Sequence, residues 1–151
     1  LGTVNLARVI EGAVRELTAT SEAPQPPQIE VVGQLPFALA QRGVLQQVLS
    51  NLLSNAVKFV APGTVPIIRI WAEERPRWVR LWIEDNGVGI SPHHFERIFR
   101  PFERLQGIDQ YPGTGIGLAI VQRGVERMSG KVGVEVGAEG GSRFWIELLR
   151  P

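Results

Sequence analysis

The segment from Leu45 to Phe59 constrains the fold of this chain more than any other, because it predicts a helix with two very different sides. At ~100° per residue, its apolar residues fall on one side of the helix, which would face a core. These residues are Leu45, Val48, Leu49, Leu52 and Ala56. The segment therefore predicts an amphipathic helix packed on a hydrophobic core.

The opposite side of this helix carries a narrow polar stripe. Gln47, Asn51, Asn55 and Lys58 point within about 80° of one another. Carboxamide oxygens suit a hard divalent cation, and a lysine suits a phosphate. The alternative is an ordinary amphipathic helix with its polar residues in water. The stripe by itself leaves both interpretations open.

Length and composition limit the classes of protein to which this chain can belong. It has 151 residues, which most simply form one domain over residues 1–151, and it is 44% hydrophobic and 21% charged. A net charge of +1 gives no electrostatic case for nucleic acid or for membrane contact. The absence of cysteine excludes disulfides and thiolate metal sites. No apolar run approaches the roughly 18 residues of a membrane span. Because the chain begins at Leu1 rather than Met, we expect a fragment of a longer protein.

Hydrophobic spacing and turn residues predict an alternation of helices and strands. Asn5 would cap the first helix, and Ser91 would cap a short helix that ends near Phe99. The expected long helices are Leu6–Leu17, Gln41–Val60 and Ile116–Met128, and the expected strands are Ile29–Val32, Ile67–Ala72, Trp78–Asp85, Val132–Val136 and Arg143–Leu149. A long loop would run from Arg100 to Gly113. Because no regular βαβ series results, the class is α+β with helices on one sheet face.

Asp85 ends a strand in phase with Leu81 and Ile83, which predicts a carboxylate on the core side. Such a carboxylate is costly unless it has a partner, and the exocyclic amine of a purine is a suitable one. Gly87 and Gly89 would then let the backbone approach a flat ring. The alternative is a common strand-end turn.

Residues 113–121 predict a glycine-rich loop that runs into a helix, where free N–H groups and the helix dipole suit a phosphate. The pattern is not a Walker A motif, because no Gly-Lys-Ser/Thr follows. Three arginines near the long loop would meet a terminal phosphate or remain solvated charges: Arg97, Arg100 and Arg104.

The order of these motifs resembles the ATP-binding catalytic domain of bacterial sensor histidine kinases. The resemblance extends from about Val4 to Leu149, and Tyr111-Pro112-Gly113 is similar to the phytochrome-like and hybrid branch. The matching motifs are Asn51…Asn55…Lys58 (N box), Asp85-x-Gly87-x-Gly89 (first glycine box), Phe99-x-x-Phe102 (F box), Gly113-x-Gly115-x-Gly117 (second glycine box) and Gly140-Gly141-Ser142-x-Phe144. The resemblance implies a two-layer α/β sandwich, with a mixed, mostly antiparallel sheet packed against about three helices, as in gyrase and mismatch-repair ATPases.

The resemblance also implies a role for each site residue. Asn55 would bind Mg²⁺ with Asn51 beside it, Lys58 would reach the ATP phosphates, and Asn55 and Lys58 would be the catalytic pair. Asp85 would accept from the adenine amine, with Ser142 nearby. The base pocket would be lined by Gly87, Gly89 and Ile90, and the phosphates would be held by Arg104, Gly113, Thr114, Gly115, Gly117 and Leu118.

The activity that the resemblance implies is transfer of the γ-phosphoryl group of Mg-ATP to a histidine on a separate dimerisation domain. That domain would lie upstream, since His93 and His94 are not in a helix with a His-Asp/Glu pair. A response regulator receiver domain would be the next partner, and the location would be cytoplasmic. Two alternatives remain: a stand-alone serine kinase of the anti-sigma-factor type, against which the F box argues, and a nucleotide-binding regulatory module without transfer.

Overall fold

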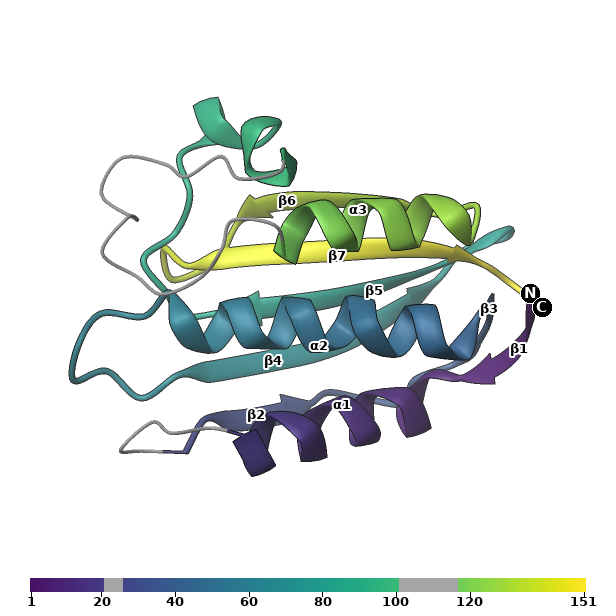
Figure 1. Cartoon of the computed structure of the whole chain (residues 1–151), viewed down its shortest axis with the longest axis horizontal. Helices are drawn as coiled ribbons and strands as arrows, with labels where there is room; N and C mark the ends of the chain where they lie inside the picture. The colour runs from purple at the N-terminus through teal and green to yellow at the C-terminus, as the bar shows by residue number, and fades with distance from the viewer. Residues whose placement is uncertain (21–25, 101–116) are drawn as a thin grey trace.

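The computed structural model describes residues 1–20, 26–100 and 117–151, which form an open sheet with helices on one face (Figure 1). The helices are α1 (Leu6–Thr20), α2 (Arg42–Lys58) and α3 (Gly117–Arg127), with two 3₁₀ turns, η1 (Pro92–His94) and η2 (Arg97–Phe99). The strands are β1 (Gly2–Asn5), β2 (Gln28–Val31), β3 (Phe37–Ala40), β4 (Ile67–Glu74), β5 (Trp78–Asp85), β6 (Lys131–Val136) and β7 (Ser142–Leu149). The expected α+β class is confirmed.

The sheet is mixed and mostly antiparallel. Its strand order is β1-β3-β7-β5-β4-β2, and β6 pairs with β7. Only the pairing of β2 with β4 is parallel among the described strands. The long strands β4, β5 and β7 are neighbours in the middle of the sheet. The loops that follow or precede these strands at one end of the sheet are therefore close together in space.

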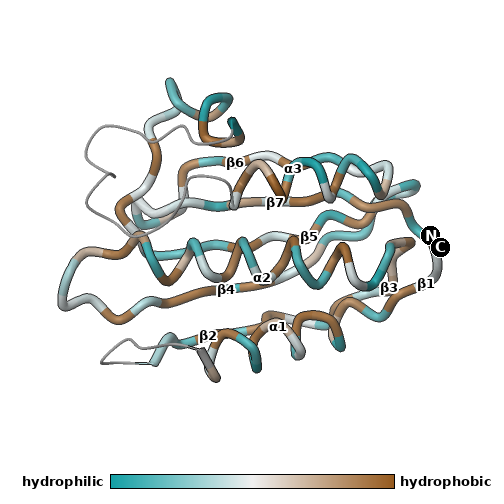
Figure 2. Tube along the Cα trace, in the orientation of Figure 1, coloured by the Kyte–Doolittle hydropathy of each residue, from teal (hydrophilic) through white to brown (hydrophobic). Residues whose placement is uncertain are grey.

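The core lies between the sheet and the three helices of the described residues. Helix α2 crosses the middle of the sheet (Figure 1) and buries Leu45, Val48, Leu49, Leu52, Leu53 and Ala56. Hydrophobic and hydrophilic residues alternate along all three helices (Figure 2). The predicted apolar stripe of α2 is therefore confirmed, and α2 is the central element of the helical layer.

Local sequence signals succeed at some element ends and fail at others. The side-chain Oδ1 of Asn5 accepts a hydrogen bond from Ala7 N at 3.0 Å, so Asn5 caps α1 as expected. The expected short helix after Ser91 is instead the pair of 3₁₀ turns, and Ser91 makes no side-chain cap. Strands β1 and β3 were not expected: β1 runs directly into α1 without a turn residue, and the residues of β3 do not alternate between apolar and polar.

The outer face of the sheet, opposite the helices, carries rows of side chains that run across the strands. The middle row contains, in order across four strands, Trp71, Trp82, Trp145 and Gly133, each directly opposite the next. Rows of alternating charge flank this aromatic row on both sides. One is Glu30, Arg69, Glu84, Arg143 and Glu135, and the other is Glu73, Arg80, Glu147 and Lys131.

These rows explain how Trp82 is buried on a face that bears no helix among the described residues. Trp82 is only 6% exposed. Its ring stacks on that of Trp71 at 5.9 Å, and the guanidinium groups of Arg80 and Arg143 lie 5.4 and 5.8 Å from its centroid. Arginine side chains therefore cover the indole ring of Trp82 on this face.

No helix in the described ranges is long and apolar enough to cross a membrane.

The packing of α2 against α3 depends on the missing side chain of Gly124. A methyl group there would lie 2.7 Å from Val48 Cγ2 and 3.2 Å from Val44 Cγ1. Because β-branched side chains are stiff in helices, we expect Gly124→Ala to lower the free energy of unfolding by about 1–3 kcal/mol in urea titrations.

Gly43 is the matched control for that substitution, because it also lies in a helix but has open space around its Cα. Gly43→Ala should raise the free energy of unfolding by about 0.4–1 kcal/mol, since alanine restricts the unfolded chain. Equal effects of the two substitutions would contradict the proposed helix contact.

Candidate functional site

Four segments that are distant in sequence meet at one end of the sheet. Helix α2 ends there, α3 begins there, β5 ends there, and the turn from β6 to β7 lies beside them, at the left of Figure 1. Most of the polar residues singled out from the sequence lie on these segments. This end of the sheet is therefore the candidate site.

Asn51 and Asn55 face the beginning of α3. A methyl group built at Gly117 would lie 3.5 Å from Asn51 Oδ1 and 3.8 Å from Asn55 Oδ1. Asn51 Nδ2 donates to the Gln47 carbonyl at 3.0 Å, which leaves the Asn51 oxygen to accept from other groups. The polar stripe predicted on α2 thus lies against the N-terminus of a second helix.

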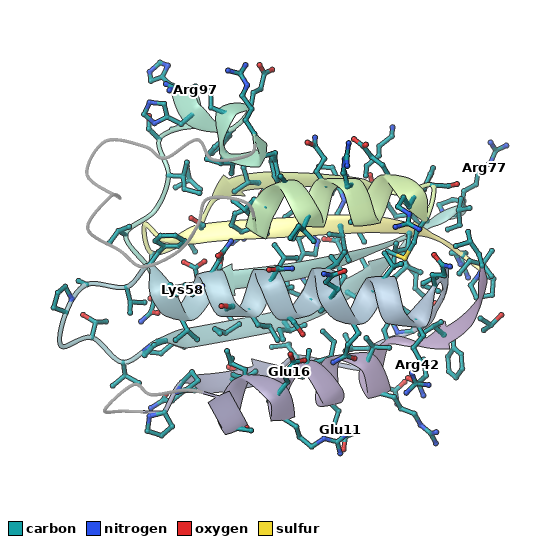
Figure 3. The ribbon with its side chains drawn as sticks, in the orientation of Figure 1. Glu11, Glu16, Arg42, Lys58, Arg77 and Arg97 are labelled. Carbon is teal, nitrogen blue, oxygen red and sulfur yellow. The ribbon has the colours of Figure 1, made fainter. Side chains whose placement is uncertain are left out.

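Lys58 is the last residue of α2, and its side chain is exposed. Figure 3 shows it at the end of α2 next to the site, whereas Arg42 lies at the opposite end of the same helix. The ammonium group of Lys58 is thus placed at the rim of the candidate site.

Asp85 has a largely buried carboxylate that binds two backbone N–H groups. Its Oδ1 accepts from Gly87 N at 2.9 Å and from Ser142 N at 3.1 Å. Loss of hydration on burial raises the pKa of Asp85 above 3.8, although the two hydrogen bonds act in the opposite direction. Ser142 is also buried. Its backbone contact with Asp85 agrees with the expectation that the two residues lie close together.

The glycines of this turn are required by contacts within the protein itself. A side chain at Gly87 would meet the Phe59 carbonyl, one at Gly89 would meet the Gly140 carbonyl, and one at Gly141 would meet the Asp85 carbonyl, all within 2.4 Å. Gly89 also has a φ of +78°. Neighbouring backbone therefore requires glycine at Gly87 and Gly89, and the expectation that these glycines also give room to a flat ring stays a prediction.

Asn86 connects the same turn to the segment before β4. Its Oδ1 accepts from Ile67 N at 2.8 Å, and its Nδ2 donates to the Val65 carbonyl at 2.9 Å. Val88 N also donates to the Phe59 carbonyl at 2.8 Å. The role of Asn86 was not recognised from the sequence, because its partners are about twenty residues away and have no distinctive side chains.

The remaining expected residues are partly within the described ranges. Ile90 and Leu118 are half-buried against the core. Phe99 is buried, and its ring lies edge-on to that of Phe144 with 6.3 Å between the centroids. Arg97 and Arg100 are exposed. The other expected residues lie outside the described residues: Phe102, Arg104, Gly113, Thr114 and Gly115.

The described residues contain no group of three or more His, Cys, Asp or Glu side chains that would hold a metal ion. His93 and His94 both lie in η1 rather than in such a group.

A two-layer sandwich with these motifs at one end of its sheet defines a class of ATP-binding domain. Residues 40–151 match the family described as Histidine kinase-, DNA gyrase B-, and HSP90-like ATPase, and the chain belongs to that family. Within it, the chain corresponds to the catalytic ATP-binding part of sensor histidine kinases, as its relatives and structural neighbours indicate.

Two curated relatives illustrate this similarity. The chain is 40% identical over 118 residues to the phytochrome-like protein Cph1 of Synechocystis sp., an alignment that covers 78% of this chain and 16% of Cph1. It is 44% identical over 110 residues to the sensor histidine kinase AruS of Pseudomonas aeruginosa, covering 69% of this chain and 11% of AruS. The chain thus spans about a sixth or less of the length of these relatives.

Two solved structures share the fold over nearly the whole chain. The mycobacterial sensor histidine kinase MprB superposes with a TM-score of 0.83 at 26% identity, covering 99% of this chain and 98% of that chain. Full-length ShkA in complex with AMPPNP superposes with a TM-score of 0.78 at 31% identity, covering 99% of this chain and 31% of that chain.

The raised pKa of Asp85 predicts a pH-dependent cost in stability. Because the folded chain holds this proton more tightly than the unfolded chain, the contribution of Asp85 is most favourable below pH 3.8 and is lost as pH rises through the folded pKa. We therefore expect Asp85→Asn to become progressively more stable relative to the wild type as pH rises from about 4 to 7.

Urea unfolding at a series of pH values, without nucleotide, measures this difference. Asparagine keeps an oxygen that accepts from Gly87 N and Ser142 N, so the substitution removes mainly the buried charge. A stability difference that stays constant across this pH range would contradict the raised pKa.

Proposed function

We propose that this chain binds Mg-ATP and donates its γ-phosphoryl group to a histidine on a separate dimerisation domain in two-component signal transduction. The observation that carries the proposal is that two polar groups lie at the same end of the sheet: the buried Asp85 carboxylate, bound to Ser142 N, and the Asn51 and Asn55 carboxamides, which face the start of α3. All of residues 1–151 are assigned to one catalytic domain in this proposal.

Adenine recognition is assigned to Asp85 and the turn that follows it. Both backbone N–H groups bind Oδ1, so Oδ2 is the oxygen that would accept from the exocyclic amine of the base. Burial makes such a hydrogen bond strong, and a base without an amine would not supply a donor to Oδ2. Gly87, Gly89, Ile90 and Ser142 are the neighbouring residues assigned to the base pocket.

The phosphates are assigned to the space between α2 and the start of α3. The first N–H groups of a helix such as α3 have no partner within the helix, and they lie at the positive end of the helix dipole. Lys58 supplies a positive charge from the end of α2. The other residues assigned to the phosphates are Gly117 and Leu118 together with Arg104, Gly113, Thr114 and Gly115.

The residues present fit a Mg²⁺ ion that enters with the nucleotide. Mg²⁺ is usually held by few protein oxygens together with phosphates and water, and two carboxamide oxygens at the start of α3 match that pattern. Asn55 is the assigned ligand, with Asn51 beside it. When bound, Mg²⁺ neutralises charge on the phosphates during transfer.

The chain contributes to this transfer by positioning and electrostatics. A histidine nitrogen attacks the γ-phosphorus in line, the bond from the γ-phosphorus to the bridging oxygen breaks, and ADP leaves. Asp85 orients the base, while Lys58 and the α3 N-terminus hold the phosphates, so the two reacting groups are kept aligned. The nucleophile belongs to the dimerisation domain, and a receiver domain of a response regulator then accepts the phosphoryl group.

The relatives support this proposal over its alternatives. Similar proteins are named sensor kinases, and ShkA was solved with AMPPNP, a non-hydrolysable ATP analogue. A stand-alone serine kinase or a regulatory module without transfer would use the same base pocket. The pocket itself therefore does not distinguish these alternatives from the proposal, whereas the names of the relatives favour the proposal. For the parent protein, the cytoplasm is the proposed location of this domain.

Phosphotransfer from ATP labelled on its γ-phosphate tests the proposal directly. We expect the mixture of this chain with the histidine-bearing dimerisation domain to label that domain, and Asp85→Asn to abolish both labelling and ATP binding measured by calorimetry. ATP binding without transfer of label would favour a regulatory module. Unchanged affinity in Asp85→Asn would contradict the role of Asp85.

The magnesium assignment predicts a conditional effect of Asn55→Ala. The substitution should weaken ATP binding by about tenfold with Mg²⁺, which corresponds to about 1.4 kcal/mol, and much less with EDTA. Gln47→Ala, two turns earlier on the same polar stripe, should have a small effect that is equal in both conditions. Equal losses for Asn55→Ala with Mg²⁺ and with EDTA would contradict Asn55 as the ligand.

A further inference from the structure

An ion pair on the outer face of the sheet lies directly behind the base-recognising carboxylate. Glu84 precedes Asp85 on β5, and Arg143 follows Ser142 on β7. Glu84 and Arg143 are directly opposite in the strand register, and Glu84 Oε2 accepts from Arg143 Nε at 2.9 Å and from Nη2 at 2.7 Å. Neither residue was singled out from the sequence.

Glu84 also contacts the turn that joins β6 to β7. Its Oε2 accepts from Ala138 N at 3.3 Å. On the inner face, Asp85 accepts from Ser142 N, just after the same turn. Two consecutive carboxylates therefore bind this turn and its exit from the two faces of the sheet.

The turn has little room to move relative to Asp85. Gly141 lies against the Asp85 carbonyl, and the Gly140 carbonyl lies against Gly89. Within the turn, Gly137 N donates to the Gly141 carbonyl at 2.7 Å. A shift of the turn would therefore displace both Ser142 N and the backbone around Asp85.

Arg143 is itself held in place by aromatic and acidic neighbours. Its guanidinium lies 5.5 Å from the Trp71 ring centroid and 5.8 Å from that of Trp82, and its Nη1 is 3.7 Å from Glu135 Oε1. The side chains of Arg143 and Glu84 are 27% and 12% exposed. A pair joined by two hydrogen bonds and this little exposed is a stronger constraint than an ordinary surface pair.

From these contacts we infer that Glu84 and Arg143 are positioning residues for base recognition. They hold the turn between β6 and β7 so that Ser142 N keeps the Asp85 carboxylate oriented toward the base. The inference rests on the proposed function, since it assigns the pair to the ATP site.

The outer face offers a matched control pair. Arg80 and Glu147 are also directly opposite, their closest atoms are 3.2 Å apart, and their side chains are 19% and 12% exposed. Arg80 likewise lies over Trp82 and Trp145, at 5.4 and 4.2 Å from the centroids. This pair lies five residues away from Asp85 along β5. It is also less fully hydrogen-bonded, because Arg80 Nε is buried without a hydrogen-bond partner among the described residues.

The test compares ATP with ITP, whose base lacks the exocyclic amine. We expect Arg143→Gln to reduce the preference for ATP over ITP about fivefold, which corresponds to about 1 kcal/mol, because Asp85 is less well oriented. Arg80→Gln should lower the melting temperature comparably and leave the preference unchanged. Arg143→Lys should restore part of the preference, because it keeps the charge.

Each result then has a definite meaning. No ATP binding by the wild type would overturn the proposed function and this inference with it. Normal wild-type binding with an unchanged ATP/ITP ratio in Arg143→Gln, or with an equal change in Arg80→Gln, would overturn the inference alone. If Arg143→Gln does not fold, Glu84→Gln replaces it with the same expected change in ratio.

Discussion

The hydrogen bonds of the buried Asp85 carboxylate require three backbone segments to approach one another closely. The arrangement of the rest of the site depends on the same approach. The end of α2, the turn after β5 and the turn before β7 touch through main-chain atoms at Gly87, Gly89 and Gly141. Any side chain at these positions would separate the segments. The glycines thus allow one carboxylate oxygen to accept N–H groups from two parts of the chain.

This junction also connects the two layers of the fold. Phe59, at the end of α2, accepts from Val88 N in the turn after β5, so the helix that carries Asn51 and Asn55 is tied to the turn that follows Asp85. The groups assigned to the base and to the phosphates are therefore held at fixed separation by backbone contacts. Positioning of this kind suits a reaction in which the protein supplies alignment and charge.

On the outer face of the sheet, aromatic side chains are covered without a helix from the described residues. A two-layer fold leaves one sheet face without helices, and on this chain a row of tryptophans lies there. Rows of alternating charge flank it, and arginine side chains cover the indole rings while their charged groups pair with glutamates. The face is thus both packed and polar.

Several features of the fold and of the site followed from the sequence because they depend on short-range periodicity. The apolar stripe of α2, the Asn5 cap and the phase of Asp85 with Ile83 each involve residues a few positions apart. The strands β1 and β3 were missed because β1 runs directly into α1 and the residues of β3 show no alternation of apolar and polar side chains, so that only pairing with other strands identifies them. The 3₁₀ turns after Ser91 were missed because a cap followed by proline suits either helix type.

By itself, the sequence determined which residues are candidates for the site and the order in which they occur. Only the tertiary structure decided which of them meet: Asp85 with Ser142, Glu84 with Arg143, and Asn51 and Asn55 with Gly117. The physical reason is strand register. Pairing of β5 with β7 brings residues almost sixty positions apart into contact, and no local pattern encodes that alignment.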